Sequence, residues 1–219
     1  MTPLPITVII PCYNMANTLA RAVESAINAN ASWVIVVNDG STDNCWQVAH
    51  RLRELHSDRV MYIENTVRLG VCASRNLAIQ KSETGLIVPL DADDQLTPQS
   101  LMVLSEGYTS NTWVYGNWIE NGDTVIAPPP GMLDRKNVCH ATMLFATGDW
   151  IAANGYDPDF NIGGEDWAFQ LALTRAGVTP VKVNEPIYIR DVSVNARTHK
   201  ARDRIPMINQ LVKEKYGNV

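Results

Sequence analysis

Short apolar runs alternate with longer segments of helical periodicity through the first part of the chain. This alternation predicts strand–helix–strand units and a mainly parallel sheet. Because the runs are apolar almost throughout, we expect helices to cover both faces of the sheet. The expected strands are residues 6–10, 34–37, 60–63 and 86–90, and the expected helices are residues 18–30, 42–55 and 71–81.

The pattern changes after residue 94. A helix beginning with Pro98 is expected to reach residue 108, and a turn at 121–123 should join two antiparallel strands. An amphipathic helix at 165–176 should end at Gly177. The other expected elements are strands at 113–118, 124–126, 141–146, 181–183 and 187–189, and an extended loop at 128–131. The second half therefore adds a smaller antiparallel part to an α/β fold.

The composition indicates one globular domain that does not bind nucleic acid. The chain has 219 residues, of which 46% are hydrophobic and 19% are charged, which suits one sizeable core. Its 23 Asp and Glu residues outnumber its 18 Lys and Arg residues. The resulting net charge of -5 disfavours binding to a phosphate backbone.

Cysteine usage and hydropathy predict a cytoplasmic protein. The four cysteines include no C-x-x-C pair, so we expect free thiols in a reducing compartment. The sequence starts with a strand-like run rather than with a signal-type segment, and no apolar stretch approaches the roughly 20 residues that span a bilayer. Apolar residues at helical spacing follow the basic segment 200–204, which predicts a helix that packs on the domain. A membrane-surface role for that helix stays open, so contact with membranes is expected to be peripheral at most.

Polar residues follow three of the expected strands directly, at 11–14, 38–43 and 91–94. In doubly wound sheets, ligands bind beyond the carboxyl ends of the strands. The last segment holds three aspartates, whose mutual repulsion a divalent cation such as Mn²⁺ or Mg²⁺ would relieve. The alternative is a solvated turn in which Asp94 caps the next helix.

The segment 38–43 has two interpretations. It forms a turn in which Gly40 can take positive φ and in which Ser41 or Thr42 caps the following helix. All six residues could serve that turn. Asp39 is not needed for the cap, however, and could accept a hydrogen bond from a base or a ribose.

Five motifs together resemble those of family 2 glycosyltransferases of the GT-A fold. They are residues 8–14, 36–43, 68–70 with 73–76, 91–94 and 164–166, in that order. The resemblance covers roughly residues 6–175. It implies an inverting transfer of a sugar from a nucleotide diphosphate-sugar to an acceptor hydroxyl, and the expected donor is a UDP-sugar. It implies a single GT-A domain over residues 1–219, in which about 1–95 bind the nucleotide and about 96–219 bind the acceptor. The acceptor would be a glycan, a lipid-linked sugar or another hydroxyl compound.

The resemblance also assigns residues to the donor site. Those implied to bind the nucleotide-sugar are Pro11, Tyr13, Asn14, Asp39, Arg75, Asp91 and Ala92. Tyr13 would pack on the base, Asp39 would bind the base and Asp91 the ribose. Arg75 would lie near the base or the diphosphate, and Asp93 would be the direct metal ligand. An aromatic ring is physically suited to stacking on a base.

The acceptor hydroxyl must lose a proton as it attacks, which requires a base within hydrogen-bond reach. Glu165 and Asp166 are candidates, although acidic residues also simply favour a helix N-terminus. The resemblance implies that Asp166 is the base. His199 lies in a basic segment where family members often carry a residue that reaches the metal. Because residues 188–191 depart from the tyrosine–arginine–x–histidine pattern, a surface position for His199 remains the alternative.

Other nucleotide-binding classes fit the sequence less well. A sugar nucleotidyltransferase would carry a Gly-rich loop with a basic residue after the first strand, where this chain has 11–14. The G-x-G-x-x-G and G-x-x-x-x-G-K-[ST] motifs are absent from the sequence. A module that binds nucleotide-sugars without turnover stays open as a second alternative.

Overall fold

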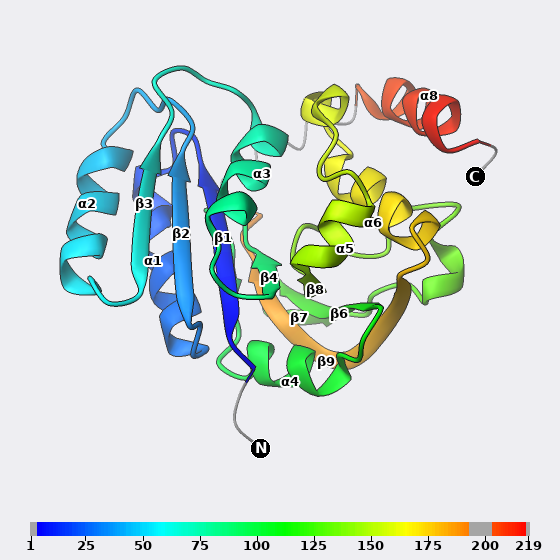
Figure 1. Cartoon of the computed structure of the whole chain (residues 1–219), viewed down its shortest axis with the longest axis horizontal. Helices are drawn as coiled ribbons and strands as arrows, with labels where there is room; N and C mark the ends of the chain where they lie inside the picture. Colours follow the sequence, from blue (N-terminus) through cyan, green and yellow to red (C-terminus); the bar gives the residue numbers. More distant parts are fainter. Residues whose placement is uncertain (1–3, 193–202, 218–219) are drawn as a thin grey trace.

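The structure is a computed structural model that describes residues 4–192 and 203–217. In this part of the chain, the first sheet has the strand order β3-β2-β1-β4-β8 (Figure 1). Its strands are β1 (Ile6–Cys12), β2 (Trp33–Asn38), β3 (Val60–Glu64), β4 (Leu86–Pro89) and β8 (Phe145–Ala146). All pairs are parallel except β4 with β8. The predicted parallel sheet is confirmed.

Helices cover both faces of this sheet. The first three are α1 (Ala16–Asn28), α2 (Cys45–Leu55) and α3 (Val71–Lys81). Alternate residues of β1 enter different cores, since Val8 and Ile10 pack with α1 and α2, whereas Ile9 packs with α3. The continuous apolar character of the strands is therefore explained by burial on both sides.

A second sheet has the order β5-β9-β6-β7. Its strands are β5 (Gln95–Leu96), β6 (Thr112–Glu120), β7 (Asp123–Val125) and β9 (Thr179–Arg190). The pairs β5–β9 and β6–β7 are antiparallel, whereas β6 and β9 run parallel. The helical elements of this half are α4 (Ser100–Gly107), η1 (Pro130–Met132), α5 (Thr147–Ala152), η2 (Pro158–Ile162), α6 (Glu165–Arg175) and α8 (Ile205–Tyr216).

Three local predictions are wrong. Residues 181–183 and 187–189 belong to one strand, β9, in which Pro186 lies at a register irregularity opposite Asn117. Proline cannot donate to a ladder, so a strand tolerates it at such an irregularity. Of the expected strand 141–146, only β8 forms, and Leu144 makes an isolated bridge to Val114. The expected loop 128–131 partly forms the helical turn η1.

The hairpin between β6 and β7 is confirmed. Glu120 pairs with Asp123, so Asn121 and Gly122 form a two-residue turn. Their φ values of 52° and 87° are those of the turn type that suits twisted strands.

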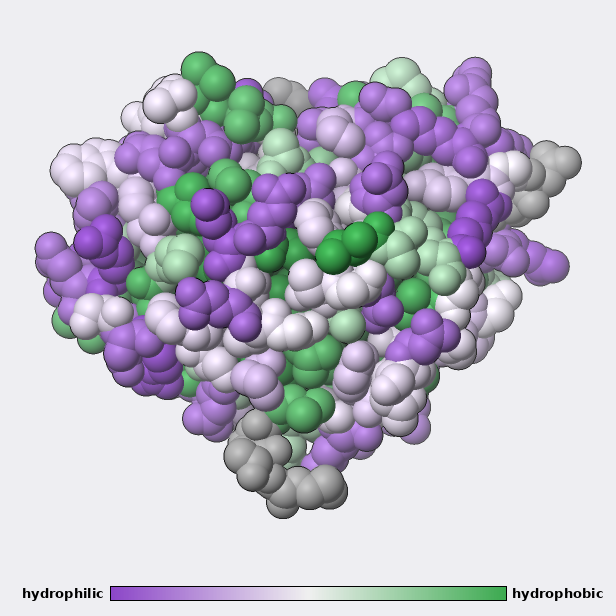
Figure 2. Space-filling model, viewed as in Figure 1, coloured by the Kyte–Doolittle hydropathy of each residue, from purple (hydrophilic) through white to green (hydrophobic). Residues whose placement is uncertain are grey.

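The surface drawn in Figure 2 is mostly hydrophilic or neutral, and its hydrophobic residues lie in small separate groups. Among the described residues, no helix has both the length and the apolar character needed to cross a membrane.

Candidate active site

Two clefts meet at the loop between β4 and β5. The first is lined by Pro11, Cys12, Tyr13, Met15, Asp39, Arg68, Val71, Ser74, Asp91, Ala92 and Asp93. The second is lined by Asp91, Asp93, Asp94, His140, Asp166, Arg190 and Asp191. Asp91 and Asp93 belong to both clefts, so ligands in the two would meet at these carboxylates.

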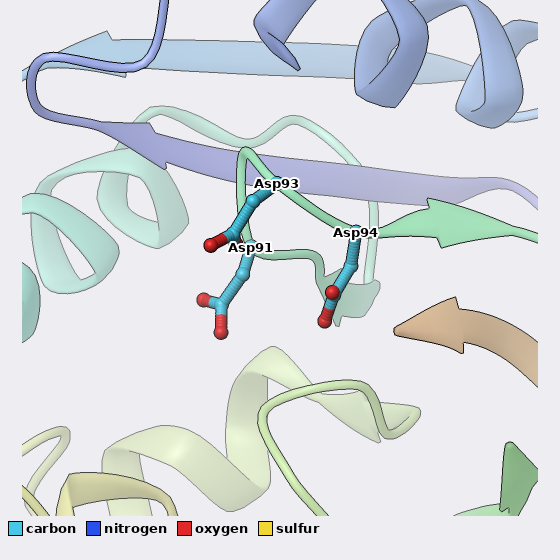
Figure 3. A group of neighbouring side chains, drawn as sticks. All are labelled: Asp91, Asp93 and Asp94. Atoms are coloured by element: carbon cyan, nitrogen blue, oxygen red, sulfur yellow. The ribbon is translucent and has the colours of Figure 1, made fainter. Parts of the chain in front are cut away.

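The three aspartates of this loop form a candidate metal centre. Their side chains leave the loop on the same side (Figure 3), and one oxygen of each lies within 4.8 Å of the others. Burial, with Asp91 and Asp93 nearby, raises the pKa of Asp94 to about 8. Oxygen ligands suit Mg²⁺ and Mn²⁺, and a bound cation would offset this repulsion. The residues present therefore fit a hard divalent cation.

Asp94 does not cap a helix, so that alternative is wrong. It is 6% exposed, and its Oδ1 accepts a hydrogen bond from the Asp191 backbone N at 3.0 Å. The next helix, α4, begins at Ser100. Asp94 instead joins the acidic loop to the end of β9.

Arg21 of α1 supports the same loop. Its Nη2 donates to the backbone oxygen of Asp93 at 3.1 Å and pairs with the carboxylate of Asp191. The side chain of Asp191 is 16% exposed. The loop is therefore held from α1 and from β9 together.

Asp39 organises the wall of the first cleft. It is 4% exposed, and its carboxylate accepts hydrogen bonds from the backbone N of Leu69 and of Gly70, both at 2.8 Å. Asn65 Nδ2 donates to it at 2.9 Å. These bonds fix the segment that carries Arg68, whose guanidinium lies 4.0 Å from the centre of the Tyr13 ring. An aromatic ring and a cation thus lie together at the expected place of the base.

The expected cap by Ser41 or Thr42 is wrong, because α2 begins later, at Cys45. Asp43 makes the local contact instead, since its Oδ1 accepts a hydrogen bond from Cys45 N at 3.0 Å. Ser41 and Thr42 bind Asn14, through Asn14 N to Ser41 Oγ at 3.0 Å and Thr42 N to Asn14 Oδ1 at 2.8 Å. Asn14 is exposed and ties the loops after β1 and β2 together.

All four cysteines are free thiols, as predicted. The Sγ atoms of Cys12 and Cys45 lie 3.0 Å apart, and the backbone N of Met15 donates to the Cys45 sulfur at 3.2 Å. These contacts add to those that join the loops after β1 and β2.

Arg75 is buried and, within residues 4–192 and 203–217, lines neither cleft. Its side chain is 1% exposed and forms ion pairs with Asp91 at 2.8 Å and with Glu165 at 3.0 Å. A buried guanidinium is stable only where carboxylates compensate it. Arg75 therefore connects the donor loop to the start of α6, and its expected contact with the nucleotide stays a prediction.

The structure distinguishes the two residues of the acidic pair. Asp166 lines the second cleft, where its Oδ2 accepts a hydrogen bond from Asn137 Nδ2 at 2.8 Å. Burial raises the pKa of Asp166, which favours a base, although a hydrogen bond from the Trp167 backbone N opposes the shift. Burial also raises the pKa of Glu165 to about 7 against the effect of Arg75. Within the described residues, Glu165 lines neither cleft.

A sequence model described as "Glycosyl transferase family 2" matches residues 7–133. The match covers more than half of the chain and includes every residue of the first cleft. The chain belongs to glycosyl transferase family 2. The predicted family is thereby confirmed.

Known proteins similar to this chain differ in length. The chain is 23% identical to the chondroitin synthase of Escherichia coli over 223 residues, which cover 94% of this chain and 32% of that protein. It thus spans about a third of that relative. It is 25% identical to the UDP-Glc:alpha-D-GlcNAc-diphosphoundecaprenol beta-1,3-glucosyltransferase WfaP of Escherichia coli over 223 residues, covering 94% of this chain and 85% of WfaP.

A solved structure confirms the GT-A fold of this family 2 chain. The mannosyltransferase PcManGT from Pyrobaculum calidifontis, in complex with GDP-Man and Mn²⁺, is similar with a TM-score of 0.74. The identity is 19%, and the match covers 96% of this chain and 63% of that one.

Sequence reasoning missed two residues of the second cleft in this family 2 chain, Arg190 and Asp191. Arg190 is the last residue of β9 and Asp191 follows it, so the rule that singled out residues at the ends of the other strands could have found them. His140 also lines this cleft, and its ring N Nδ1 bonds the hydroxyl of Tyr188. Burial and Arg190 lower the pKa of His140 to about 4, so its imidazole is neutral at pH 7. His199 lies outside the described residues.

We expect Asp39→Asn to weaken both the fold and nucleotide binding. The amide keeps one acceptor oxygen but turns a donor toward the Gly70 N–H, which is then unsatisfied. The free energy of unfolding should fall by about 1–3 kcal/mol in urea titrations. Calorimetry should show weaker nucleotide binding, because the segment that carries Arg68 loses its anchor.

Asp58→Asn is the matched control, since the Asp58 side chain is 79% exposed. It should leave the free energy of unfolding and the nucleotide affinity unchanged. Equal stability and equal nucleotide affinity of Asp39→Asn and the wild type would contradict the assigned role.

Proposed function

We propose that this chain is an inverting glycosyltransferase that transfers a sugar from a UDP-sugar to a glycan hydroxyl. The observation that carries the proposal is the meeting of the two clefts at Asp91 and Asp93. One cleft has the groups that suit a nucleotide, and the other holds a carboxylate that suits a base. The second cleft with Asp166 favours turnover over a module that only binds nucleotide-sugars.

In this proposal the first cleft binds the nucleotide. Tyr13 stacks on the base, and Pro11 and Ala92 form apolar parts of the wall. Arg68, already beside the Tyr13 ring, supplies positive charge near the donor. About residues 1–95 therefore make the nucleotide-binding half.

Asp93, with Asp91 and Asp94, would hold Mn²⁺ or Mg²⁺. The bound cation would offset the negative charge that builds on the departing diphosphate. The Mn²⁺ in the PcManGT complex supports the same choice of metal. Asp91, which lines both clefts, would be held by its ion pair with Arg75.

The second cleft would hold the acceptor. Asp166 takes the proton of the attacking hydroxyl, and Asn137 keeps its carboxylate in place. With Asp166 as the base, the acceptor hydroxyl attacks the anomeric carbon from the side opposite the leaving diphosphate. This direct displacement inverts the anomeric centre. About residues 96–219 would form this acceptor-binding half.

The name of WfaP supports both substrates, because it states UDP-Glc as donor and a GlcNAc-diphosphoundecaprenol as acceptor. We therefore propose a lipid-linked glycan as the first acceptor to test. Ile205 and Met207, which are 49% and 51% exposed at the start of α8, would suit peripheral contact with such a lipid surface. A cytoplasmic location fits the free thiols.

A thermal-shift screen tests the donor. UDP-, GDP- and dTDP-sugars are added with and without Mn²⁺, and UDP-glucose with Mn²⁺ should raise the melting temperature most. At a concentration of 100 Kd, a ligand adds about 2.7 kcal/mol, which corresponds to roughly 5–10 °C for a chain of this size.

Transfer is then measured with UDP-glucose and a GlcNAc-diphospho-lipid, by release of UDP, by the mass of the lipid product and by the NMR coupling of its anomeric proton. The expected product carries one added hexose in the β configuration. Binding of every donor without release of UDP would contradict the proposed turnover and favour the binding module.

A further inference from the structure

Helix α8 packs against the glycine pair that precedes Glu165 and Asp166. A Cβ atom at Gly164 would lie 2.5 Å from Cγ2 of Ile208, and one at Gly163 would lie 3.0 Å from its Cδ1. Ile208 is 8% exposed. The glycines therefore permit an approach of α8 that any larger residue would prevent.

The same glycines give the backbone conformational freedom directly before α6, the helix that carries Asp166. Gly163 and Gly164 have φ values of 125° and 76°, and α6 starts at the next residue, Glu165. Glycine populates such conformations readily, and it also leaves them readily. Without packing against it, the pair would act as a hinge at the start of α6, and Asp166 would move with it.

Further contacts hold α8 on both sides of this hinge. Before the hinge, Arg204 Nη1 donates to the Ile162 backbone oxygen at 3.2 Å. Lys215 pairs with the carboxylates of Asp157 and Asp159. Ile162 and Asp159 lie in η2, and Asp157 directly precedes it.

After the hinge, the ring of Tyr216 lies 5.1 Å from the guanidinium of Arg175 at the end of α6. The Tyr216 ring also lies 6.3 Å from that of Phe160 in η2. Helix α8 thus bridges η2 and α6, and Ile208 fills the space over the glycines between them.

We propose that α8, through Ile208, is a positioning element that holds Asp166 at the geometry needed for proton transfer. The inference rests on the function proposed above. A base works only when held within about 0.5 Å of its productive position, and a misplacement of 1 Å can cost about 100-fold in rate. Ile208 itself touches neither cleft in the described part of the chain, so its effect on rate must pass through the glycine pair.

The test compares Ile208→Ala with Val212→Ala. Val212 is fully buried on the same helix and belongs to the same apolar cluster, but in the described chain it does not meet the glycines. Transfer from UDP-glucose to a GlcNAc-diphospho-lipid in the presence of Mn²⁺ gives kcat and the KM for UDP-glucose, and calorimetry gives UDP affinity. Melting temperatures show that both variants are folded.

We expect Ile208→Ala to lower kcat by about 10- to 100-fold, with KM and UDP affinity unchanged. Val212→Ala should lose comparable stability and keep the wild-type kcat. Ile208→Val keeps the branched carbon over Gly164 and should recover most of the rate.

Asp166→Asn is measured in parallel. If Asp166→Asn is inactive while Ile208→Ala and Val212→Ala have the same kcat, the positioning role is wrong and the proposed function survives. If the wild type turns over none of the UDP-, GDP- and dTDP-sugars, the function fails and this inference fails with it.

Discussion

Replacing Asp93 with alanine should abolish both the activity and its dependence on a divalent cation. Asp93 lies where the two clefts meet, and one of its carboxylate oxygens is within 4.8 Å of those of Asp91 and Asp94. Loss of one group that stabilises charge in the transition state typically costs about 100- to 1000-fold in rate. We expect a loss at least that large, because the variant loses the ligand and with it the bound cation.

The measurement is release of UDP from UDP-glucose over a range of Mn²⁺ concentrations, for the wild type and for Asp93→Ala. The wild type should lose activity in EDTA and regain it when Mn²⁺ is restored. Asp123→Ala, at an exposed position in β7, controls for the loss of one negative charge. Undiminished turnover of the wild type in excess EDTA would refute the role of the metal.

The strands that position this site were predictable because their pattern is local. Continuous apolar runs such as that of β2 require burial on both faces, and the polar residues that follow them then meet at one edge of the sheet. Asp39, Asp91 and Asp93 do meet there. Where a local signal was ambiguous, the prediction failed. Two short apolar runs, at 181–183 and 187–189, predicted two strands, but β9 is continuous and its ladder with β6 accommodates Pro186 at an irregularity.

The contacts that orient the site residues were not predictable, because they join residues far apart in the sequence. Arg21 reaches Asp191 across 170 positions, and Arg75 joins Asp91 to Glu165. Periodicity shows which residues of one helix or strand are buried. It does not show which cationic side chain forms an ion pair with which carboxylate on another element. Nothing in the sequence indicated that Arg75 pairs with two carboxylates inside the protein, and its expected contact with the nucleotide stays a prediction.

Asp166→Asn should remove most transfer activity and leave donor binding nearly intact. General-base catalysis contributes about 10²- to 10⁴-fold to rate, and an amide cannot accept the proton. Asn137 can still donate to the remaining oxygen of the variant, but the new amide group then faces the Trp167 backbone N, so the free energy of unfolding should fall by about 1–3 kcal/mol while the protein stays folded. The measurements are sugar transfer, UDP affinity with Mn²⁺, and unfolding in urea.

Glu165→Gln should affect mainly the stability rather than the rate, because Glu165 forms an ion pair with the buried guanidinium of Arg75. The amide keeps a hydrogen-bond acceptor for Arg75 but removes its charge, so the free energy of unfolding should fall by about 1–3 kcal/mol. The rate should fall less than in Asp166→Asn, through a small shift of Arg75 and Asp91. Wild-type transfer by Asp166→Asn would place the base elsewhere. An inactive but stable Glu165→Gln protein would move the base to Glu165, whose carboxyl, with a pKa raised to about 7 by burial, would also be suited to taking up a proton near neutral pH.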